Sequence, residues 1–305
     1  MKQTIEYYYS LKLDKLFIEG DAYHFILDDS DYYFVFCNRT IDDLKEIVEC
    51  SRQLKEKNVI CHDIILNNKQ EVITKIEDVN YILLKVANKD RELSIVEIIE
   101  QNKKTKLSSI KTKLYRNDWA NLWSKKIDYI ESQLNEVEVD RVVRKSIDYY
   151  IGLTENAIYY VTKISQLYNI SENDNVVLSH RRIYYPNTNL NYANPLTFIF
   201  DLEVRDVAEY IKSLYFYNET DAFLELQTYL KSVSLTQYSY NMLFARLLYP
   251  SYYFDCYEKI VNKKQDSECL IKIISKVDNY ENFIRKAYNE ISLYAKLEKI
   301  NWLIY

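Results

Sequence analysis

The order of apolar and polar residues changes along the chain and divides it into two parts. Up to about residue 87, short runs of β-branched and aromatic residues alternate with polar turns, a pattern typical of strands. Two such runs lie at residues 23–27 and 32–36, and the polar stretch 28–31 between them predicts a turn. We therefore expect a β-hairpin at this point.

One helix is predicted among these strands. Asp42 and Asp43 open it, where acidic side chains suit the positive end of the helix dipole. Apolar residues follow at three- and four-residue spacing. The runs at 64–66, 71–76 and 81–86 then predict a three-stranded meander. The first part is thus expected to be a small antiparallel sheet carrying one helix.

Helical periodicity dominates beyond residue 115. An apolar stripe begins at Trp119, and a second helix is predicted over 145–168. Short strands are predicted at 175–178 and 195–200, and then helices from 204 and near 219–232, 238–249, 251–262, 266–276 and 279–298. Pro250 should separate two of these helices, because proline has no backbone donor. We divide the chain into domains 1–88 and 89–305.

Composition excludes several classes of protein. The 305 residues include only 2 glycines and 3 prolines, so the glycine-rich loops of dinucleotide-binding and Walker-type proteins are absent. No apolar run approaches the roughly 18–20 residues that cross a bilayer. The first ten residues lack the apolar core of a signal peptide. We expect cytoplasmic synthesis and no membrane association.

Cysteine, histidine and tyrosine content adds little chemistry. The five cysteines form no CxxC pair, so we expect reduced thiols, and three histidines argue against a zinc site. Tyrosine is abundant, at 31 residues. It could serve oxidative cross-linking in a coat material, but the favoured interpretation is a compositional bias together with good packing of tyrosine at half-buried positions.

Charge is unevenly distributed. The net charge of −5 arises within the first 88 residues, whereas residues 101–126 hold many lysines and arginines against a single acid, Asp118. Such a segment could contact acidic partners. Because the chain is acidic overall and the segment lacks interleaved aromatic residues, we interpret it as a solvated connector and helix face, and expect no nucleic-acid binding.

One segment could carry catalysis. Residues 180–187 lie between the two short strands, and Asp201 ends the second strand. In bacterial phosphotransferases related to protein kinases, a loop in this place carries a histidine, an aspartate two residues on and an asparagine five beyond that. A metal-binding aspartate then ends the next strand. His180, Asn187 and Asp201 match this pattern, and Arg182 occupies the position of the catalytic aspartate.

The chain resembles the spore coat kinase-like family of Firmicutes, of the YutH type and related to CotS, which look like distant aminoglycoside and choline phosphotransferases. The resemblance is carried by LWSKKID at 122–128, YYIGLTENAI at 149–158, SHRRI at 179–183, FDLEVRDVAEYI at 200–211 and ARLLYP at 245–250. It implies an α+β, bilobal, protein-kinase-like fold of the aminoglycoside phosphotransferase type. The N-lobe would be small and β-rich, and the larger C-lobe helical.

Three parts of a phosphotransferase are missing. There is no glycine-rich loop, the strand at 32–36 has no lysine, and Arg182 replaces a carboxylate with a cation that cannot accept a proton at neutral pH. Arg39, just past that strand, is the nearest cation. Since phosphoryl transfer relies on positioning and electrostatics, these losses argue against ordinary ATP-dependent transfer.

We therefore expect a degenerate catalytic loop at His180, Arg182 and Asn187, with His180 as a core histidine whose ring binds backbone. An Arg182–Asp201 salt bridge would fill the place of a metal, and Asp201, Arg205 and Asp206 would form an ion-pair network. The predicted function is a pseudokinase that binds or scaffolds, with protein partners and no cofactor; the resemblance implies a role in spore coat assembly. The alternative is an atypical small-molecule phosphotransferase using Mg-ATP, with Asn187 and Asp201 as metal ligands. A third interpretation is a generic interaction module.

Overall fold

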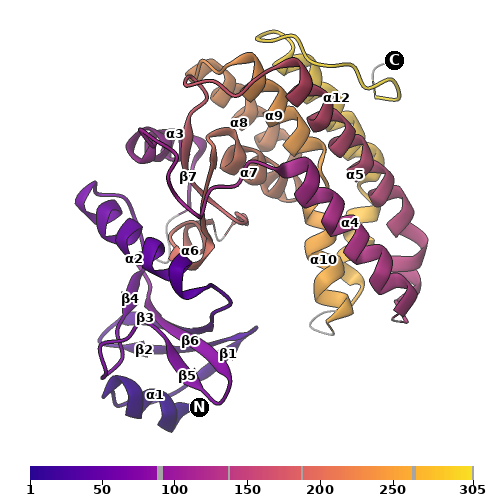
Figure 1. Ribbon diagram of the computed structural model, residues 1–305. Coiled ribbons are helices and arrows are strands. Elements are labelled where there is room, and N and C mark those ends of the chain that lie inside the picture. The colour runs from indigo at the N-terminus through magenta and orange to yellow at the C-terminus, as the bar shows by residue number, and fades with distance from the viewer. Residues whose placement is uncertain (88–91, 137, 187, 263–265, 304–305) are drawn as a thin grey trace.

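The computed structural model describes residues 1–87, 92–136, 138–186, 188–262 and 266–303. Residues 1–87 form a small N-terminal lobe, and the larger, mainly helical C-terminal lobe follows (Figure 1). The N-terminal lobe comprises α1 (Lys2–Tyr9), β1 (Phe17–Glu19), β2 (Ala22–Leu27), β3 (Ser30–Phe36), α2 (Ile41–Glu56), β4 (Asp63–Ile65), β5 (Thr74–Ile76) and β6 (Val79–Lys85). The boundary predicted at residue 88 lies outside the described residues.

The sheet of the N-terminal lobe is antiparallel, with strand order β1-β2-β3-β6-β4. The predicted hairpin is confirmed as β2 and β3, joined by Asp28 and Asp29, both with positive φ, at 48° and 56°. Aspartate tolerates this conformation better than most residues. The predicted meander is wrong in its pairing, because β4 and β5 both pair with β6. Strands of three residues leave too little alternation to fix the pairing from sequence.

Helices cover both faces of this sheet. On one face Phe25, Phe34 and Leu83 pack with Ile5 of α1. On the other, Leu84 belongs to the core that includes α2 and the C-terminal lobe. Figure 1 shows α1 on the outer side of the sheet and α2 between the sheet and the helices of the second lobe. Helix α2 was predicted from the sequence, whereas α1 and β1 were not.

The C-terminal lobe contains the remaining elements: α3 (Ile95–Thr105), α4 (Trp119–Glu136), α5 (Arg141–Leu167), β7 (Val176–His180), α6 (Thr188–Tyr192), the 3-10 turn η1 (Pro195–Thr197), β8 (Phe198–Leu202), α7 (Val204–Tyr217), α8 (Glu219–Ser232), α9 (Gln237–Leu248), α10 (Ser251–Val261), α11 (Glu268–Ile274) and α12 (Val277–Ile291). The predicted helices and both short strands are present, and Pro250 separates α9 from α10. The second strand begins only at Phe198, after the 3-10 turn, and the last helix ends at Ile291 and not at residue 298. Helix α3, whose C-terminal half overlaps the start of the segment 101–126 that was predicted to be a connector, was not predicted. No helix in the described part of the chain is long and apolar enough to cross a membrane.

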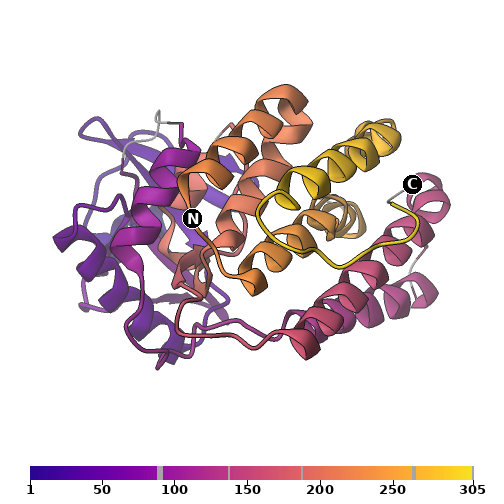
Figure 2. The same ribbon diagram turned by 90° about the horizontal axis from the view of Figure 1, so that it is seen from above.

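A helical layer surrounds the β7–β8 hairpin. Helices α4 and α5 pack side by side on the side of the molecule away from the N-terminal lobe (Figure 2). The C-terminal segment runs back to α5, where the backbone N–H of Glu298 donates to the Tyr160 hydroxyl (3.2 Å) and Trp302 Nε1 donates to Asn156 Oδ1 (3.1 Å). The residues after α12 therefore help to fix α5.

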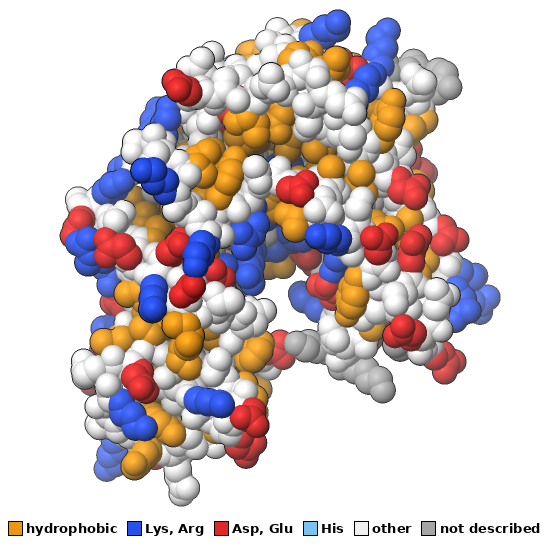
Figure 3. All heavy atoms as spheres, viewed as in Figure 1, with side chains coloured by type: hydrophobic (Ala, Val, Ile, Leu, Met, Phe, Trp, Pro, Cys, Tyr) orange, Lys and Arg blue, Asp and Glu red, His pale blue; other side chains and the backbone are white. Residues whose placement is uncertain are grey.

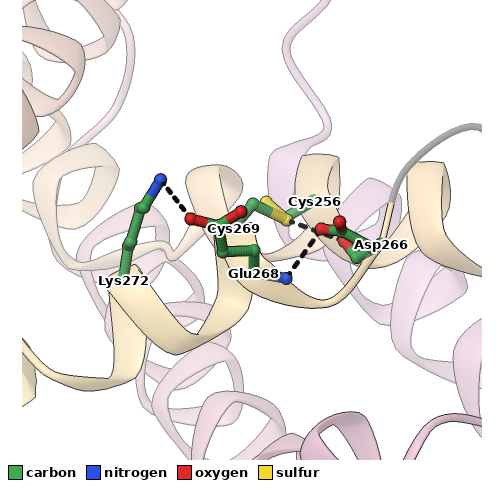
Figure 4. The surroundings of a disulfide bond; sticks show 5 residues. All are labelled: Cys256, Asp266, Glu268, Cys269 and Lys272. Atoms are coloured by element: carbon green, nitrogen blue, oxygen red, sulfur yellow. Dashed lines mark hydrogen bonds and ion pairs between the residues drawn. A yellow bond between two sulfur atoms is a disulfide. The ribbon is translucent and has the colours of Figure 1, made fainter.

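The cysteines depart from the prediction. Cys256 on α10 and Cys269 on α11 form a disulfide, whereas Cys37, Cys50 and Cys61 are free (Figure 4). The expectation of five reduced thiols is wrong for this pair. The two cysteines stand 13 residues apart and come together because α10 and α11 pack against each other, which their spacing in sequence does not indicate.

Candidate functional site

His180 ends β7 and is held by α7. Its ring Nδ1 lies 2.6 Å from Asp206 Oδ2, and its backbone N–H donates to Asp206 Oδ1 at 2.9 Å. Both side chains are 1% exposed. Since two bonds tie the end of β7 to the first turn of α7, His180 positions the loop that follows it. The ring partner is a carboxylate and not the backbone group expected from sequence.

Arg182, which was predicted to replace the catalytic carboxylate, is held by two acidic residues. Its Nε donates to Asp255 Oδ2 at 2.8 Å and lies 4.0 Å from Glu209 Oε2, while Nη1 donates to the carbonyl oxygen of Arg181 at 2.9 Å. Burial alone would lower the pKa of this guanidinium, but Asp255 and Glu209 raise it above its ordinary value. Arg182 is therefore a fixed cation at this site.

The predicted Arg182–Asp201 salt bridge is wrong, because Asp201 is paired with other arginines. Its Oδ2 accepts from Arg205 Nη1 (3.1 Å) and Arg246 Nη2 (2.6 Å), and its Oδ1 accepts from the backbone N–H of Leu202 (2.7 Å). The pair with Arg205 was expected; Arg246 was missed. Asp206, expected in the same network, binds His180 instead.

Trp119 completes this cluster. The guanidinium carbons of Arg205 and Arg246 each lie 4.4 Å from the centre of its ring system. Asp201, Arg205 and Arg246 are all nearly inaccessible to solvent. Burial, together with the neighbouring Arg246, lowers the pKa of Arg205 to about 10. A metal ion at Asp201 would have to displace a buried guanidinium.

The predicted metal ligand Asn187 lies outside the described residues. Helix α6 follows it directly. The described ranges contain no group of three or more His, Cys, Asp or Glu side chains placed to hold a metal ion.

The charges continue from Arg182 into the lobe. Glu209 Oε1 accepts from Lys212 Nζ at 2.8 Å, and Lys212 also donates to Ser251 Oγ (2.7 Å) and to the Tyr249 carbonyl (3.2 Å). Burial lowers the pKa of Lys212 to about 8. For Glu209, burial raises the pKa but Lys212 and Arg182 outweigh it, giving a value of about 2. Sequence reasoning missed these residues, although a glutamate and a lysine among the mainly apolar residues 207–217 were a signal.

A cavity opens beside Arg182. It has a volume of about 530 Å³ and is lined by the loop after β7 and by α7, α10 and α11. Arg182, Glu209, Lys212 and Asp255 all contribute to its wall. In Figure 3 the surface is hollowed between the two lobes, and Lys and Arg side chains gather beside the hollow.

The N-terminal lobe offers little to a phosphate group. The β1–β2 turn contains Gly20, with φ of +61°, but no glycine-rich loop. On β2, His24 lies 2.9 Å from Glu19 and 2.5 Å from Asp31, and stacks on Tyr33 of β3 with ring centres 4.6 Å apart. Strand alternation puts His24 and Tyr33 on the sheet face opposite α1, which is the face turned toward the larger lobe.

Arg39, the nearest cation to β3, fastens the two lobes together. Its Nε donates to the carbonyl of Leu196 at 2.9 Å and its Nη2 to that of Phe198 at 2.6 Å. The side chain is buried. Arg39 is therefore engaged by the C-terminal lobe and not directed at the cleft as a free cation.

Over nearly its whole length, the chain is similar in sequence to spore coat proteins. A family model described as spore coat putative kinase YutH matches residues 2–287. The endospore coat-associated protein YutH of Bacillus subtilis (strain 168) is 25% identical over an alignment of 334 positions, which covers 99% of this chain and 98% of that protein.

Solved structures of phosphotransferases share the fold. An aminoglycoside phosphotransferase from Alicyclobacillus acidocaldarius superposes with a TM-score of 0.65 at 11% identity, covering 96% of this chain and 97% of that one. A spectinomycin phosphotransferase in complex with AMP gives a TM-score of 0.60 at 12% identity, covering 94% and 96%. These similarities confirm the predicted aminoglycoside and choline kinase-like fold, with a sheet in the N-terminal part and a largely helical C-terminal part.

Proposed function

Because the chain belongs to the spore coat putative kinase YutH family, we propose that it is a catalytically inactive kinase-like protein that acts by binding, as a component of the spore coat. The observation that carries the proposal is the pairing at the two catalytic positions. Arg182 stands in place of the proton acceptor and is fixed by Asp255, while Asp201 is fully engaged by Arg205, Arg246 and a backbone N–H.

The electrostatics of these positions oppose phosphoryl transfer. A guanidinium cannot take the proton of an attacking hydroxyl, and Arg182 is further stabilised as a cation by its acidic neighbours. A Mg²⁺ ion at Asp201 would approach the buried cations Arg205 and Arg246, and like charges in a region of low dielectric constant repel strongly. In this proposal an arginine replaces the base, and the carboxylate that would bind the metal is paired with two further arginines.

The N-terminal lobe supports the same proposal. Strand β3 has no lysine to neutralise phosphates, and Arg39 donates to backbone carbonyls of the other lobe. Glu19 and Asp31 flank His24 on the face turned toward the larger lobe, and carboxylates there disfavour a polyphosphate.

Measurements of nucleotide binding and turnover test the proposal that the protein is catalytically inactive. Thermal unfolding is compared in millimolar ATP with Mg²⁺ and in ATP with a chelator, and ADP release is followed with the purified protein. We expect no Mg²⁺-dependent stabilisation and no ADP release. A ligand at 100 times its Kd would stabilise the fold by roughly 2.7 kcal/mol, which is readily detected. An Mg²⁺-dependent ADP-releasing activity that co-elutes with the protein in column fractions would overturn the proposal in favour of the phosphotransferase alternative.

The coat part rests on the family and on the printed name of the Bacillus subtilis relative. A fluorescent fusion, followed through sporulation of the producing organism, should collect around the forespore and remain with the coat fraction of mature spores. Fluorescence spread evenly through the mother cell at every stage would contradict it.

A further inference from the structure

The cavity beside Arg182 has the form of a ligand site. Its volume of about 530 Å³ falls within the ~300–1,000 Å³ typical of small-molecule pockets. Aromatic side chains form much of its wall, among them Tyr184, Phe216 and Tyr252. A flat apolar group would find extended contact there.

The acidic residues of the cavity wall are paired with cations. Asp255 accepts from Arg182 and from the Tyr184 hydroxyl, and Glu209 accepts from Lys212 and Ser251. The charges of Asp255 and Glu209 are thus balanced by Arg182 and Lys212. The other charged side chains of the wall therefore determine the sign of the electrostatic potential in the cavity.

The remaining charges of the wall are positive. Lys259, Lys272 and Lys276 line the cavity along α10, α11 and the residue that precedes α12. Lys259 Nζ lies 5.8 Å from the centre of the Tyr184 ring. Lys276 donates to the uncharged carbonyl of Phe216 at 2.9 Å. Lys272 Nζ lies 3.0 Å from Glu268 Oε1 in an exposed ion pair on α11, which balances the charge of Lys272 (Figure 4).

Arg182 itself has donor capacity left. Its Nε and Nη1 are used, whereas Nη2 has no hydrogen-bond partner among the residues that the structure describes. The side chain is 28% exposed and forms part of the cavity wall. A guanidinium fixed in this way offers a donor directed by its planar geometry.

We propose that this cavity binds a small organic anion, with a carboxylate or phosphate group carried on a flat apolar body. The anionic group would be bound by Arg182 Nη2 and the nearby lysines, and the body would pack on the aromatic wall. This inference rests on the proposed function, because the ligand is held and not phosphorylated. A cationic ligand of the same size would meet excess positive charge.

Binding of phenyl phosphate tests the proposal, in the absence of nucleotide and of divalent metal. Titration calorimetry and thermal unfolding are compared for phenyl phosphate, inorganic phosphate and benzylamine at one low ionic strength. We expect saturable binding and stabilisation with phenyl phosphate, at least several-fold weaker binding of inorganic phosphate, and no binding of benzylamine.

Two lysine variants locate the site. Lys259→Gln removes a charge from the cavity wall and should weaken phenyl phosphate binding about three- to ten-fold at low salt. Lys103→Gln, an exposed lysine of α3 that does not line the cavity, should leave the affinity unchanged. Equal affinities of Lys259→Gln and the native chain, binding of benzylamine as tight as that of phenyl phosphate, or no binding of phenyl phosphate at millimolar concentration would each overturn the inference. None of these outcomes touches the ATP assay, so the two proposals fail separately.

Discussion

At the scale of single residues, the site is organised around buried carboxylates that are shared by more than one cation. Asp201 neutralises Arg205 and Arg246, which both pack on Trp119. Two buried guanidiniums with one carboxylate leave a positive excess, which lowers the pKa of Arg205 together with burial. The carboxylate is therefore required for stability, whether or not it has any role toward a metal.

Substituting Asp201 measures this requirement. In Asp201→Asn the shape is kept, but two buried cations lose their counter-charge, and breaking a buried pair typically costs about 3–5 kcal/mol. We expect a loss of this size in the free energy of unfolding from urea denaturation. Asp42→Asn, which breaks the exposed pair between Asp42 and Lys113 (2.7 Å), is the matched control and should change stability little. Equal, small effects of the two variants would argue that Asp201 is not the counter-charge of the cluster.

At the scale of elements, the pattern of the sequence was informative where elements are long. Helix α8 lies at the predicted residues, and the β2–β3 hairpin follows the predicted aromatic runs. Shorter elements were not predicted, including the three-residue β1 and the eight-residue α1, because a few residues cannot distinguish the helical from the strand periodicity.

Capping shows how local chemistry fixes an element that periodicity missed. Helix α3 begins with a capping box, in which Ser94 Oγ accepts from the Glu97 N–H (3.3 Å) and Glu97 Oε2 accepts from the Ser94 N–H (3.0 Å). The helix packs on β7, α7 and α8, and Asn102 donates to the Glu203 carbonyl at 3.1 Å. The cap therefore supports the elements that hold the site.

Ser94→Ala should lower the free energy of unfolding by about 1 kcal/mol, because two backbone donors at the start of α3 lose their partners or their geometry. Chemical denaturation measures the change. Ser132→Ala, an exposed position within α4, is the control; alanine favours helix there, so stability should be unchanged or slightly higher. A control variant as destabilised as Ser94→Ala would indicate that the cap contributes nothing specific.

The candidate site was only half accessible to sequence reasoning. His180, Arg182 and Asp201 were found because a spacing pattern marks them. Their partners were not, because Arg246 is 45 residues from Asp201 and Asp255 is 73 residues from Arg182. Ion pairs at such separations are created by the tertiary fold, and a spacing pattern does not contain them. The same reason explains the mistaken Arg182–Asp201 pair.

At the scale of the whole molecule, polar contacts join the two lobes at the segment that leads from β7 to β8. Arg39 reaches the carbonyls of Leu196 and Phe198, and the backbone N–H of His62 donates to the carbonyl of Ala193 at 2.8 Å. These contacts fix the N-terminal lobe to the segment between β7 and β8.

His62 makes this junction sensitive to pH. Its ring Nε2 donates to the Leu190 carbonyl (3.0 Å), and its Nδ1 accepts from the Ala87 N–H (3.2 Å). The neutral ring therefore makes one hydrogen bond to the C-terminal lobe and one to the N-terminal lobe. Protonation of Nδ1 would remove the acceptor of the hydrogen bond from the Ala87 N–H. Burial lowers the pKa of His62 from 6.5 to about 4, so the unfolded chain takes up a proton at a higher pH than the folded chain does.

The consequence is a loss of stability on acidification. The contribution of His62 is fully present above pH 6.5 and declines as the pH falls from 6.5 toward 4. Between about pH 7.5 and 5 the loss should be roughly 2 kcal/mol. Urea unfolding at the two pH values measures it, with His62→Asn as the comparison, because asparagine keeps a donor and an acceptor but does not titrate. The variant is expected to be less stable at pH 7.5 and to show a smaller decline toward pH 5. Identical declines in both proteins would place the acid sensitivity in other groups and leave His62 as a packing residue of the junction.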